Sequence, residues 1–368
     1  MKLISFLAAA SFLPLMLSAA EPARTYENKL VRLQNPPPLL ADHPEFIAPV
    51  NELVRFEAPT LVDDASADLL VRAWRFSYNA RGVIEMPNRL RSDDTAIIFV
   101  HPWGIDDGQG WRTPEPAGVV DFCTLEKNKL AARHTREVIV PFITSLCGKA
   151  KFVMHSLPGS EDPIRRKLYR SFTRTPSVAE RAEGAKELAA KLNAFNYRGE
   201  PLPAQLKVSP DKSVVDYFKQ FPGLDAGARY NGEGFWNLPI PITLDADARP
   251  EDVVIYDSAG YEPLRKFLAE SGVRHVLLVG YATDMCYCRT TAGYENLRKD
   301  FNVFLVGDAT LATFPANDSP RHATNAHISY AALNNLVTQV SWVKLVKPGG
   351  RSRRKETQGD SNWTGAEL

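Results

Sequence analysis

Residues 275–288 read HVLLVGYATDMCYC, and the fold is decided in this stretch. The run from His275 to Val279 is short, apolar and β-branched, which is typical of a strand buried on both faces of a parallel sheet. Gly280 ends the run, residues 281–284 predict a tight turn, and Cys286 opens a segment, Tyr287 to Leu297, that we expect to be helical. Strand, sharp turn, cysteine and helix is the arrangement of an activated nucleophile on an α/β sheet.

The position of Cys286 favours a reactive thiolate. The first turn of a helix has unpaired N–H groups and the positive end of the dipole, and both stabilise negative charge on sulfur. The same N–H groups can bind an oxyanion. The alternative interpretation is that Cys286 is a small buried hydrophobic residue, as most free cysteines are.

Composition and charge exclude several classes of partner. The chain has 368 residues, of which 44% are hydrophobic and 24% are charged, and its net charge is +1. These values are ordinary for a globular protein and give no indication of nucleic-acid or membrane binding. We therefore expect the partner to be a small-molecule substrate.

The first twenty residues have the pattern of a signal peptide. Lys2 precedes an apolar run from Leu3 to Leu17, and Ser18-Ala19-Ala20 supply the small residues of a cleavage site. The run is too short for a comfortable transmembrane helix. We expect cleavage after Ala20 and export to the periplasm or the medium.

The four cysteines leave the disulfide pattern open. In an exported protein an even number of cysteines permits disulfides, and four cysteines allow three pairings. Cys286 and Cys288 are too close in sequence for an easy bridge, so Cys123–Cys147 is the best candidate. The alternative is that no bridge forms. A single Cys-x-Cys pair predicts no metal site.

The chain before residue 93 is expected to be an extension. Residues 21–92 begin with a proline-spotted lead-in, in which Pro36-Pro37-Pro38 indicates an extended start outside the core. Two β-rich runs, Leu69–Tyr78 and Val83–Met86, flank a turn that contains Asn79 and Gly82. They predict a β-hairpin at an edge of the main domain.

From residue 93 to residue 347 apolar runs alternate with helical patterns. This alternation predicts a three-layer α/β domain with a doubly wound, Rossmann-like parallel sheet. Residues 159–240 are expected to be an insertion over the sheet edge, and residues 348–368 a disordered polar tail. The expected strands are Thr95–Val100, Lys151–Met154, Asp252–Tyr256, His275–Val279 and Asn302–Val306, and the main helices are Lys129–Leu146, Val178–Asn196, Tyr261–Ser271 and Ser319–Val343.

Side chains at the carboxyl ends of these strands are the candidates for a site, because ligands of doubly wound sheets bind there. The residues at those ends are His101, His155, Tyr256 and the 281–286 turn. The sequence contains no Gly-x-Gly-x-x-Gly after a strand, no Gly-x-x-x-x-Gly-Lys and no Gly-x-Ser-x-Gly. A dinucleotide site, an NTPase and a serine hydrolase are therefore disfavoured.

The stretch from Arg249 to Ala309 resembles the isochorismatase-like superfamily of cysteine hydrolases, which includes nicotinamidases. GYATDMC at 280–286 is similar to the family's nucleophile turn, and VGDA at 306–309 to its next strand. The resemblance implies a six-stranded parallel sheet in the order 3-2-1-4-5-6, with Cys286 as the nucleophile. It also implies an oxyanion hole made by the N–H groups of Ala282 and Cys286, and a cis peptide bond before Ala282.

Two of the three positions of the family's catalytic triad are altered. The family uses Asp, Lys and Cys, and its Asp ends the first strand. That strand ends here in FVHPW at 99–103, which puts His101 at the Asp position. The Lys position holds Tyr256, followed by Asp257. The family's activity on isochorismate or nicotinamide therefore does not carry over, and neither a metal site nor a cofactor is indicated.

The altered residues can still form a competent site. We interpret His101 as the general base, because a histidine beside a cysteine can accept its proton; alternatively it only ends a strand. Tyr256 is a candidate hydrogen-bond donor in catalysis, or else it only packs. Asp257 is assigned to substrate binding, with an orienting carboxylate as its other role. His155 and Trp103 are assigned to the substrate pocket, against the alternatives of a solvated strand end and a core aromatic.

Two hypotheses follow. In the first, the protein is an exported cysteine hydrolase that cleaves a C–N bond of a small amide through a thioester on Cys286. In the second, it is a catalytically degenerate relative that binds a small ligand or a protein partner. The altered triad favours the second hypothesis and the intact 280–286 turn favours the first. A homo-oligomer is compatible with the sequence, which indicates no number of subunits.

Overall fold

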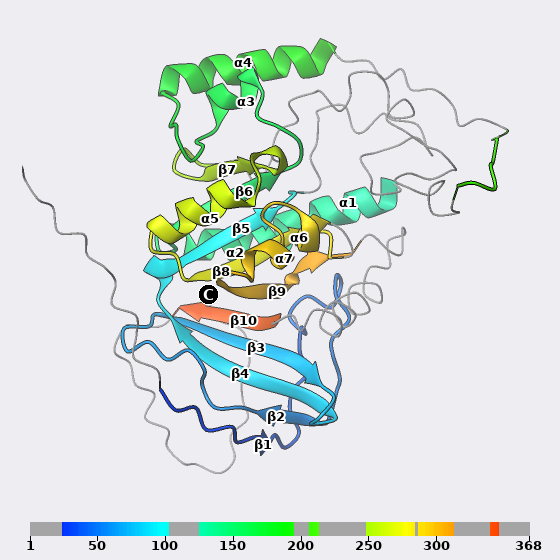
Figure 1. Ribbon diagram of the computed structural model, residues 1–368, viewed down its shortest axis with the longest axis vertical. Coiled ribbons are helices and arrows are strands. Elements are labelled where there is room, and N and C mark those ends of the chain that lie inside the picture. Colours follow the sequence, from blue (N-terminus) through cyan, green and yellow to red (C-terminus); the bar gives the residue numbers. More distant parts are fainter. Residues whose placement is uncertain are drawn as a thin grey trace, which may run out of the picture.

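The computed structural model describes residues 24–102, 125–194, 205, 207–212, 248–283, 286–312 and 339–345. These residues form one mixed sheet with the strand order β1-β2-β4-β3-β10-β9-β8-β5-β6-β7, and helices pack on it (Figure 1). The prediction of an α/β protein with a parallel sheet is confirmed.

One half of the sheet is parallel throughout. Its neighbours in space are β7-β6-β5-β8-β9-β10, and each pairs in parallel with the next. After β5 the chain builds β6 and β7 on one side and then returns to place β8 on the other side of β5, so the switch point lies between β5 and β8. The bounds are β5 Thr95–Val100, β6 Phe152–Leu157, β7 Val253–Tyr256, β8 His275–Tyr281, β9 Asn302–Leu311 and β10 Gln339–Leu345.

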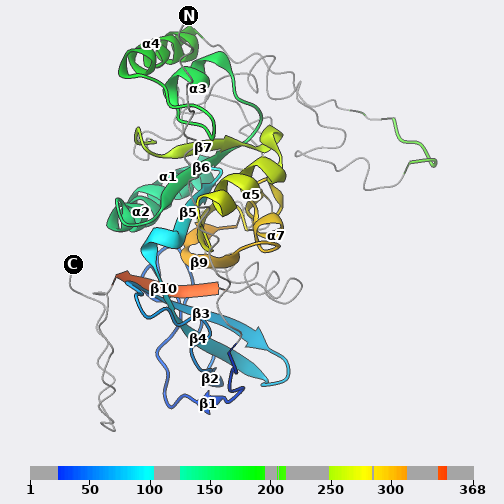
Figure 2. The same ribbon diagram turned by 60° about the vertical axis from the view of Figure 1, so that its left-hand side comes forward.

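Helices cover both faces of this parallel half (Figure 2). Helices α1 (Leu125–His134) and α2 (Val140–Leu146), joined by the π-helical turn Thr135–Ile139, bury their apolar side chains against one face. Helices α5 (Tyr261–Glu270), α6 (Cys286–Arg289) and α7 (Tyr294–Leu297) cover the other. Every residue of β5, β7 and β8 is buried as a result, which explains why these strands are continuous apolar runs.

The other half of the sheet comes from the N-terminal part of the chain. Strands β3 (Leu69–Ser77) and β4 (Gly82–Leu90) pair antiparallel as a hairpin, and β2 (Arg55–Glu57) and β1 (Val31–Arg32) extend the sheet beyond β4. Strand β3 also pairs antiparallel with β10. The hairpin therefore continues the main sheet across β10.

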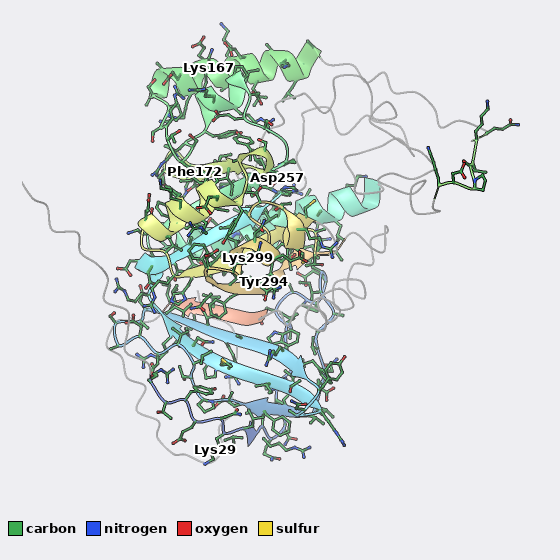
Figure 3. All side chains as sticks on the ribbon, viewed as in Figure 1. Lys29, Lys167, Phe172, Asp257, Tyr294 and Lys299 are labelled. Carbon is green, nitrogen blue, oxygen red and sulfur yellow. The ribbon has the colours of Figure 1, made fainter. Side chains whose placement is uncertain are left out.

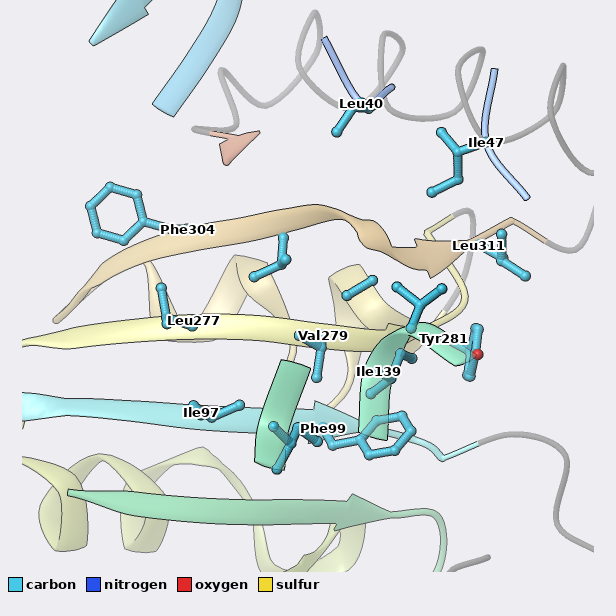
Figure 4. Packing of buried hydrophobic residues seen from close by; sticks show 14 of the residues in the cluster. Leu40, Ile47, Ile97, Phe99, Ile139, Leu277, Val279, Tyr281, Phe304 and Leu311 are labelled. Carbon is cyan, nitrogen blue, oxygen red and sulfur yellow. The ribbon is translucent and has the colours of Figure 1, made fainter. Parts of the chain in front are cut away.

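The lead-in before the hairpin belongs to the core, contrary to our expectation of a non-core start. Leu39, Leu40, Phe46 and Ile47 are at most 5% exposed and belong to the same apolar cluster as α1 and the ends of β5 and β8 (Figure 4). The proline-rich sequence makes this segment extended, but extended segments still pack when apolar side chains follow the prolines.

The expected helix Ser319–Val343 is wrong at its carboxyl end, because residues 339–345 form strand β10. Residues 313–338 lie outside the described part of the chain. The helix expected at Val178–Asn196 is present as α4 (Val178–Ala194), which packs on α3 (Pro163–Leu168). Lys167 of α3, labelled in Figure 3, bridges to Glu183 and Glu187 of α4.

Other expectations lie outside the described residues, namely the signal peptide, nearly half of the 159–240 insertion, the polar tail and Cys123. Cys147 is a free thiol in the structure, and its Sγ donates to the carbonyl of Ile143 at 3.2 Å. None of the helices in the described ranges is long and apolar enough to cross a membrane.

Candidate active site

The candidate site lies where neighbouring strands β5 and β8 end. Val100 pairs with Gly280, so His101 and the turn after Tyr281 emerge at the same edge of the sheet. Gly280 has φ 113°, and a Cβ placed on it would lie 2.1 Å from the carbonyl oxygen of Val100. Only glycine allows the two strands to approach this closely here.

His101 joins the ends of β5, β7 and β8 through its side chain. Its Nε2 lies 2.9 Å from Oδ2 of Asp257, the first residue after β7, and Cys286 is close enough to the ring to help raise the pKa of His101. The His101 side chain is 9% exposed and that of Asp257 is 28% exposed. Figure 3 labels Asp257 where β7 ends. The three side chains therefore form a linked series, carboxylate to imidazole to thiol.

The environment of His101 favours its protonated form. Burial alone lowers its pKa, but the hydrogen bonds to Asp257 and Cys286 and the charges of these groups outweigh burial, and they raise the pKa of His101 to about 9. The second carboxylate oxygen of Asp257, Oδ1, is buried and has no partner among the described residues. It can accept a hydrogen bond from a substrate or a water molecule.

Cys286 is the first residue of α6 and is partly exposed. The turn before it is fixed by backbone hydrogen bonds: Thr283 N–H donates to Leu311 C=O, and Tyr287 N–H donates to Ala282 C=O. The Tyr281–Ala282 peptide bond is cis. Among the described turn and loop hydrogen bonds, the N–H groups of Ala282 and Cys286 donate to no backbone carbonyl.

Two predicted site residues point elsewhere. Tyr256 packs with Leu157 and Val254, and the guanidinium of Arg165 lies 5.1 Å from its ring centroid. Its hydroxyl is buried without a partner in the described residues, and burial raises its pKa far above the ordinary value. No contact joins it to His101 within this part of the structure.

His155 lies inside β6, not at the strand end where we expected it, because β6 continues to Leu157. Its Nε2 lies 3.3 Å from Oδ2 of Asp252, and both side chains are 3% exposed. Arg249 donates to the same carboxylate. This buried contact links β6 to the beginning of β7. Trp103, the remaining predicted pocket residue, lies outside the described ranges.

A second polar cluster lies where Tyr281, at the end of β8, meets α1. The sequence alone did not assign this cluster to the site. His134 is 0% exposed, and its Nδ1 lies 2.7 Å from the hydroxyl of Tyr281. In the predicted helix Lys129–Leu146, His134 falls on the same face as the apolar residues Leu130 and Val138. A histidine on the apolar face of a predicted helix is the sequence feature that could have indicated this buried polar cluster.

Metal binding finds no geometric support in the residues that can be described. No three His, Cys, Asp or Glu side chains among them are grouped so that they could hold a metal ion.

One family model matches part of the chain. Residues 210–338 match the model of the isochorismatase domain, a range that includes Asp257 and Cys286 but not His101. No curated protein matches the chain. Solved structures with a similar fold include nicotinamidase PncA from Bacillus subtilis, which is 13% identical with a TM-score of 0.31. This match covers 67% of the present chain and 98% of PncA.

A cysteine hydrolase from Pseudomonas syringae pv. phaseolicola is 12% identical with a TM-score of 0.29, and the match covers 66% of this chain and 86% of the other. What the comparisons show is therefore a similarity of residues 210–338 to the isochorismatase domain.

Proposed function

We propose that the protein is a cysteine hydrolase that cleaves a C–N bond of a small amide, with Cys286 as nucleophile, His101 as base and Asp257 as the carboxylate that orients His101. The observation that carries the proposal is the double contact of His101, with Asp257 on one side and Cys286 on the other. A carboxylate, an imidazole and a thiol in series are the parts of a cysteine-hydrolase triad.

The chemistry follows from these contacts. His101 accepts the thiol proton, and the thiolate attacks the amide carbon while the carbonyl electrons move to oxygen. Because the pKa of His101 is raised to about 9, its imidazole is basic enough to hold the proton that it takes from the thiol at neutral pH. Collapse of the adduct breaks the C–N bond, and His101 protonates the leaving nitrogen. A thioester remains on Cys286.

The second half of the cycle uses the same groups in reverse. His101, now neutral, takes a proton from water as the water oxygen attacks the thioester carbon. The C–S bond breaks, the proton returns to sulfur, and the acid leaves. In both halves the N–H groups of Ala282 and Cys286, which donate to no described turn carbonyl, are the donors we assign to the oxyanion.

The replaced triad positions are compatible with this scheme. The histidine occupies the place of the family's aspartate and the aspartate lies one residue after the place of its lysine, so the chain keeps one base and one charged partner in exchanged positions. Tyr256 has no part in this mechanism, because its hydroxyl lies in a separate packed cluster. The amide substrate is proposed from the family resemblance, and export from the sequence of residues 1–20.

A comparison of two cysteine variants tests the proposal. Wild-type protein is screened for ammonia release from small amides and ureides, and its cysteines are labelled with iodoacetamide and read by mass spectrometry. Cys286→Ala is expected to abolish turnover. Cys288→Ala is the matched control and is expected to stay active, because its thiol is buried and lies 3.4 Å from the carbonyl of Thr283.

Turnover that survives in Cys286→Ala would overturn the nucleophile assignment. Slow labelling of Cys286 together with no turnover on any amide would favour the binding-only alternative. His101→Ala is expected to lower the rate by roughly 10²–10⁴, the usual size of general acid–base catalysis.

A further inference from the structure

The hydroxyl of Tyr281 is held from several sides inside the core. Tyr281 is 0% exposed and directly precedes Ala282. Its hydroxyl lies 2.7 Å from Nδ1 of His134, 2.9 Å from the hydroxyl of Thr135 and 3.1 Å from the carbonyl of Ala131. All three partners come from α1 and the π-helical turn that follows it. In Figure 4 Tyr281 lies at the end of β8 near Ile139 of that turn.

The second ring nitrogen of His134 connects the same cluster to β9. Its Nε2 lies 2.7 Å from the carbonyl oxygen of Asp308. A carbonyl can only accept, so Nε2 carries a proton. In a neutral ring Nδ1 is then an acceptor, and the Tyr281 hydroxyl donates to it, with the Ala131 carbonyl as the competing acceptor. The tautomer of His134 is thus set by the backbone of β9.

These contacts fix the residue that precedes the proposed oxyanion donor. On one side Tyr281 is tied through its ring to α1, and on the other side Thr283 N–H is tied to Leu311 of β9 at 3.1 Å. Ala282 lies between the two ties. A phenylalanine and a leucine could fill the same space without buried polar groups, which cost stability unless they are hydrogen-bonded. The groups of this cluster are hydrogen-bonded, and a satisfied buried network of this kind holds the residues that it joins in one arrangement.

We propose that His134 is a positioning residue of this site, which acts through the Tyr281 hydroxyl to hold the Ala282 N–H where the oxyanion forms. This inference rests on the proposed function and deepens it. His134 itself touches neither the thiol nor the base in the described structure. Its effect should appear in steps that build an oxyanion and be absent from steps that do not.

Two chemical probes separate these steps. p-Nitrophenyl acetate acylates a cysteine through a tetrahedral oxyanion, and release of p-nitrophenolate reports the first turnover. Iodoacetamide alkylates the same sulfur by displacement of iodide at a saturated carbon, and no oxyanion forms. A change in the reactivity of the sulfur affects both rate constants equally and leaves their ratio unchanged. A change in the ratio therefore measures how well the site stabilises the oxyanion.

Tyr281→Phe is the main variant, because it removes one oxygen and leaves the ring in place. Acylation is expected to fall at least about tenfold, less than the 10²–10³ that loss of a whole oxyanion donor causes. Alkylation of Cys286 is expected to stay close to that of the wild type. Tyr287→Phe is the matched control, since it also loses a buried tyrosine hydrogen bond, 2.6 Å to Leu278 C=O, and it should keep both rates.

Two substitutions of His134 test separately its contact with the Tyr281 hydroxyl and its contact with the Asp308 carbonyl. The amide nitrogen of asparagine lies near the place of Nδ1 and that of glutamine near the place of Nε2. The asparagine N–H donates where Nδ1 accepts, so in His134→Asn the Tyr281 hydroxyl oxygen accepts from this amide and the hydroxyl donates to Ala131 C=O. His134→Asn should therefore keep a partner for Tyr281 and acylate faster than His134→Gln, which keeps only the tie to Asp308. Circular dichroism tests whether the two His134 variants are folded. If neither of them is folded, the Tyr281→Phe result alone decides the proposal.

The outcomes are distinguishable. If wild-type protein is not acylated at Cys286, the proposed function is overturned and the role of His134 with it. If the wild type is acylated and Tyr281→Phe acylates equally fast, only the positioning role is overturned. A parallel fall of acylation and alkylation, or an equal fall in Tyr287→Phe, would also overturn it, because such a loss is general damage to the site.

Discussion

His101 adopts a left-handed backbone conformation, with φ 42°, directly after the last residue of β5. Non-glycine residues in this region are uncommon and cost of order 1–3 kcal/mol, so their environment must hold them there. Here the N–H of His101 donates to Ser156 C=O at 2.9 Å while the ring reaches Asp257. A single residue thus ties β5 to the ends of β6 and β7.

The raised pKa of His101 predicts a pH-dependent stability. The ordinary pKa of 6.5 is raised to about 9, so the folded protein binds this proton more tightly than the unfolded chain does. The resulting stabilisation is complete below pH 6.5 and is lost as the pH rises to 9. At about 1.4 kcal/mol per unit, the loss is of the order of 3 kcal/mol.

Urea denaturation of wild type and His101→Gln from pH 6 to pH 9.5 measures this effect. The difference in free energy of unfolding between the two proteins should shrink across that window, since glutamine does not titrate. A difference that stays constant would mean that His101 is not protonated at neutral pH.

At this residue scale the sequence named both partners, and it gave their contact only as the alternative role of Asp257. His101 and Asp257 were found because they follow buried strands, and strand ends meet at one edge of a parallel sheet. Their side-chain directions depend on the backbone after each strand, which no local pattern specifies. Asp257 was therefore assigned to the substrate, whereas the structure places it on His101.

Gly280 sets the spacing of two elements, the ends of β5 and β8. Gly280→Ala should destabilise the protein by several kcal/mol, because the new methyl group would overlap the Val100 carbonyl in addition to the strain of its positive φ. Gly272→Ala is the control: its φ is 79°, but a Cβ there meets nothing within 4 Å. It should cost only about 1 kcal/mol.

Thermal unfolding of both variants checks this prediction, with labelling of Cys286 as a second measurement. Equal melting temperatures in the two variants would mean that the strands can separate at Gly280 without cost.

Strand β10 shows where element prediction failed. The apolar residues Leu336, Val340 and Val343 fit a helical stripe, so residues 319–343 were predicted as one helix. The segment Gln339–Leu345 instead pairs in parallel with β9 and antiparallel with β3. A position between two other strands outweighs the local preference of this segment for a helix, because the preference for a strand depends on the neighbouring strands with which it can pair. Strands buried inside the parallel half were predicted well, since burial itself produces their pattern.

Across the whole molecule, the N-terminal segment and the candidate site share one core. Phe46 packs edge to face with His134 at a centroid distance of 5.1 Å, and the guanidinium of Arg133 lies 4.7 Å from its ring. The segment thus supports the helix whose histidine reaches Tyr281. The contact spans 88 residues of sequence, and no local pattern in a proline-rich lead-in could have revealed it.

This packing predicts that a substitution far from Cys286 in sequence damages both stability and chemistry. Phe46→Ala leaves a cavity at a 0% exposed position and should lower the free energy of unfolding by about 3–5 kcal/mol. Phe76→Ala is the matched control on the hairpin, where the residue is 41% exposed, and it should cost less than about 1 kcal/mol. Because the lost ring also supports His134, Phe46→Ala should acylate more slowly with p-nitrophenyl acetate than Phe76→Ala does. Urea titrations with parallel acylation assays measure both effects, and identical midpoints for the two variants would remove the N-terminal segment from the core.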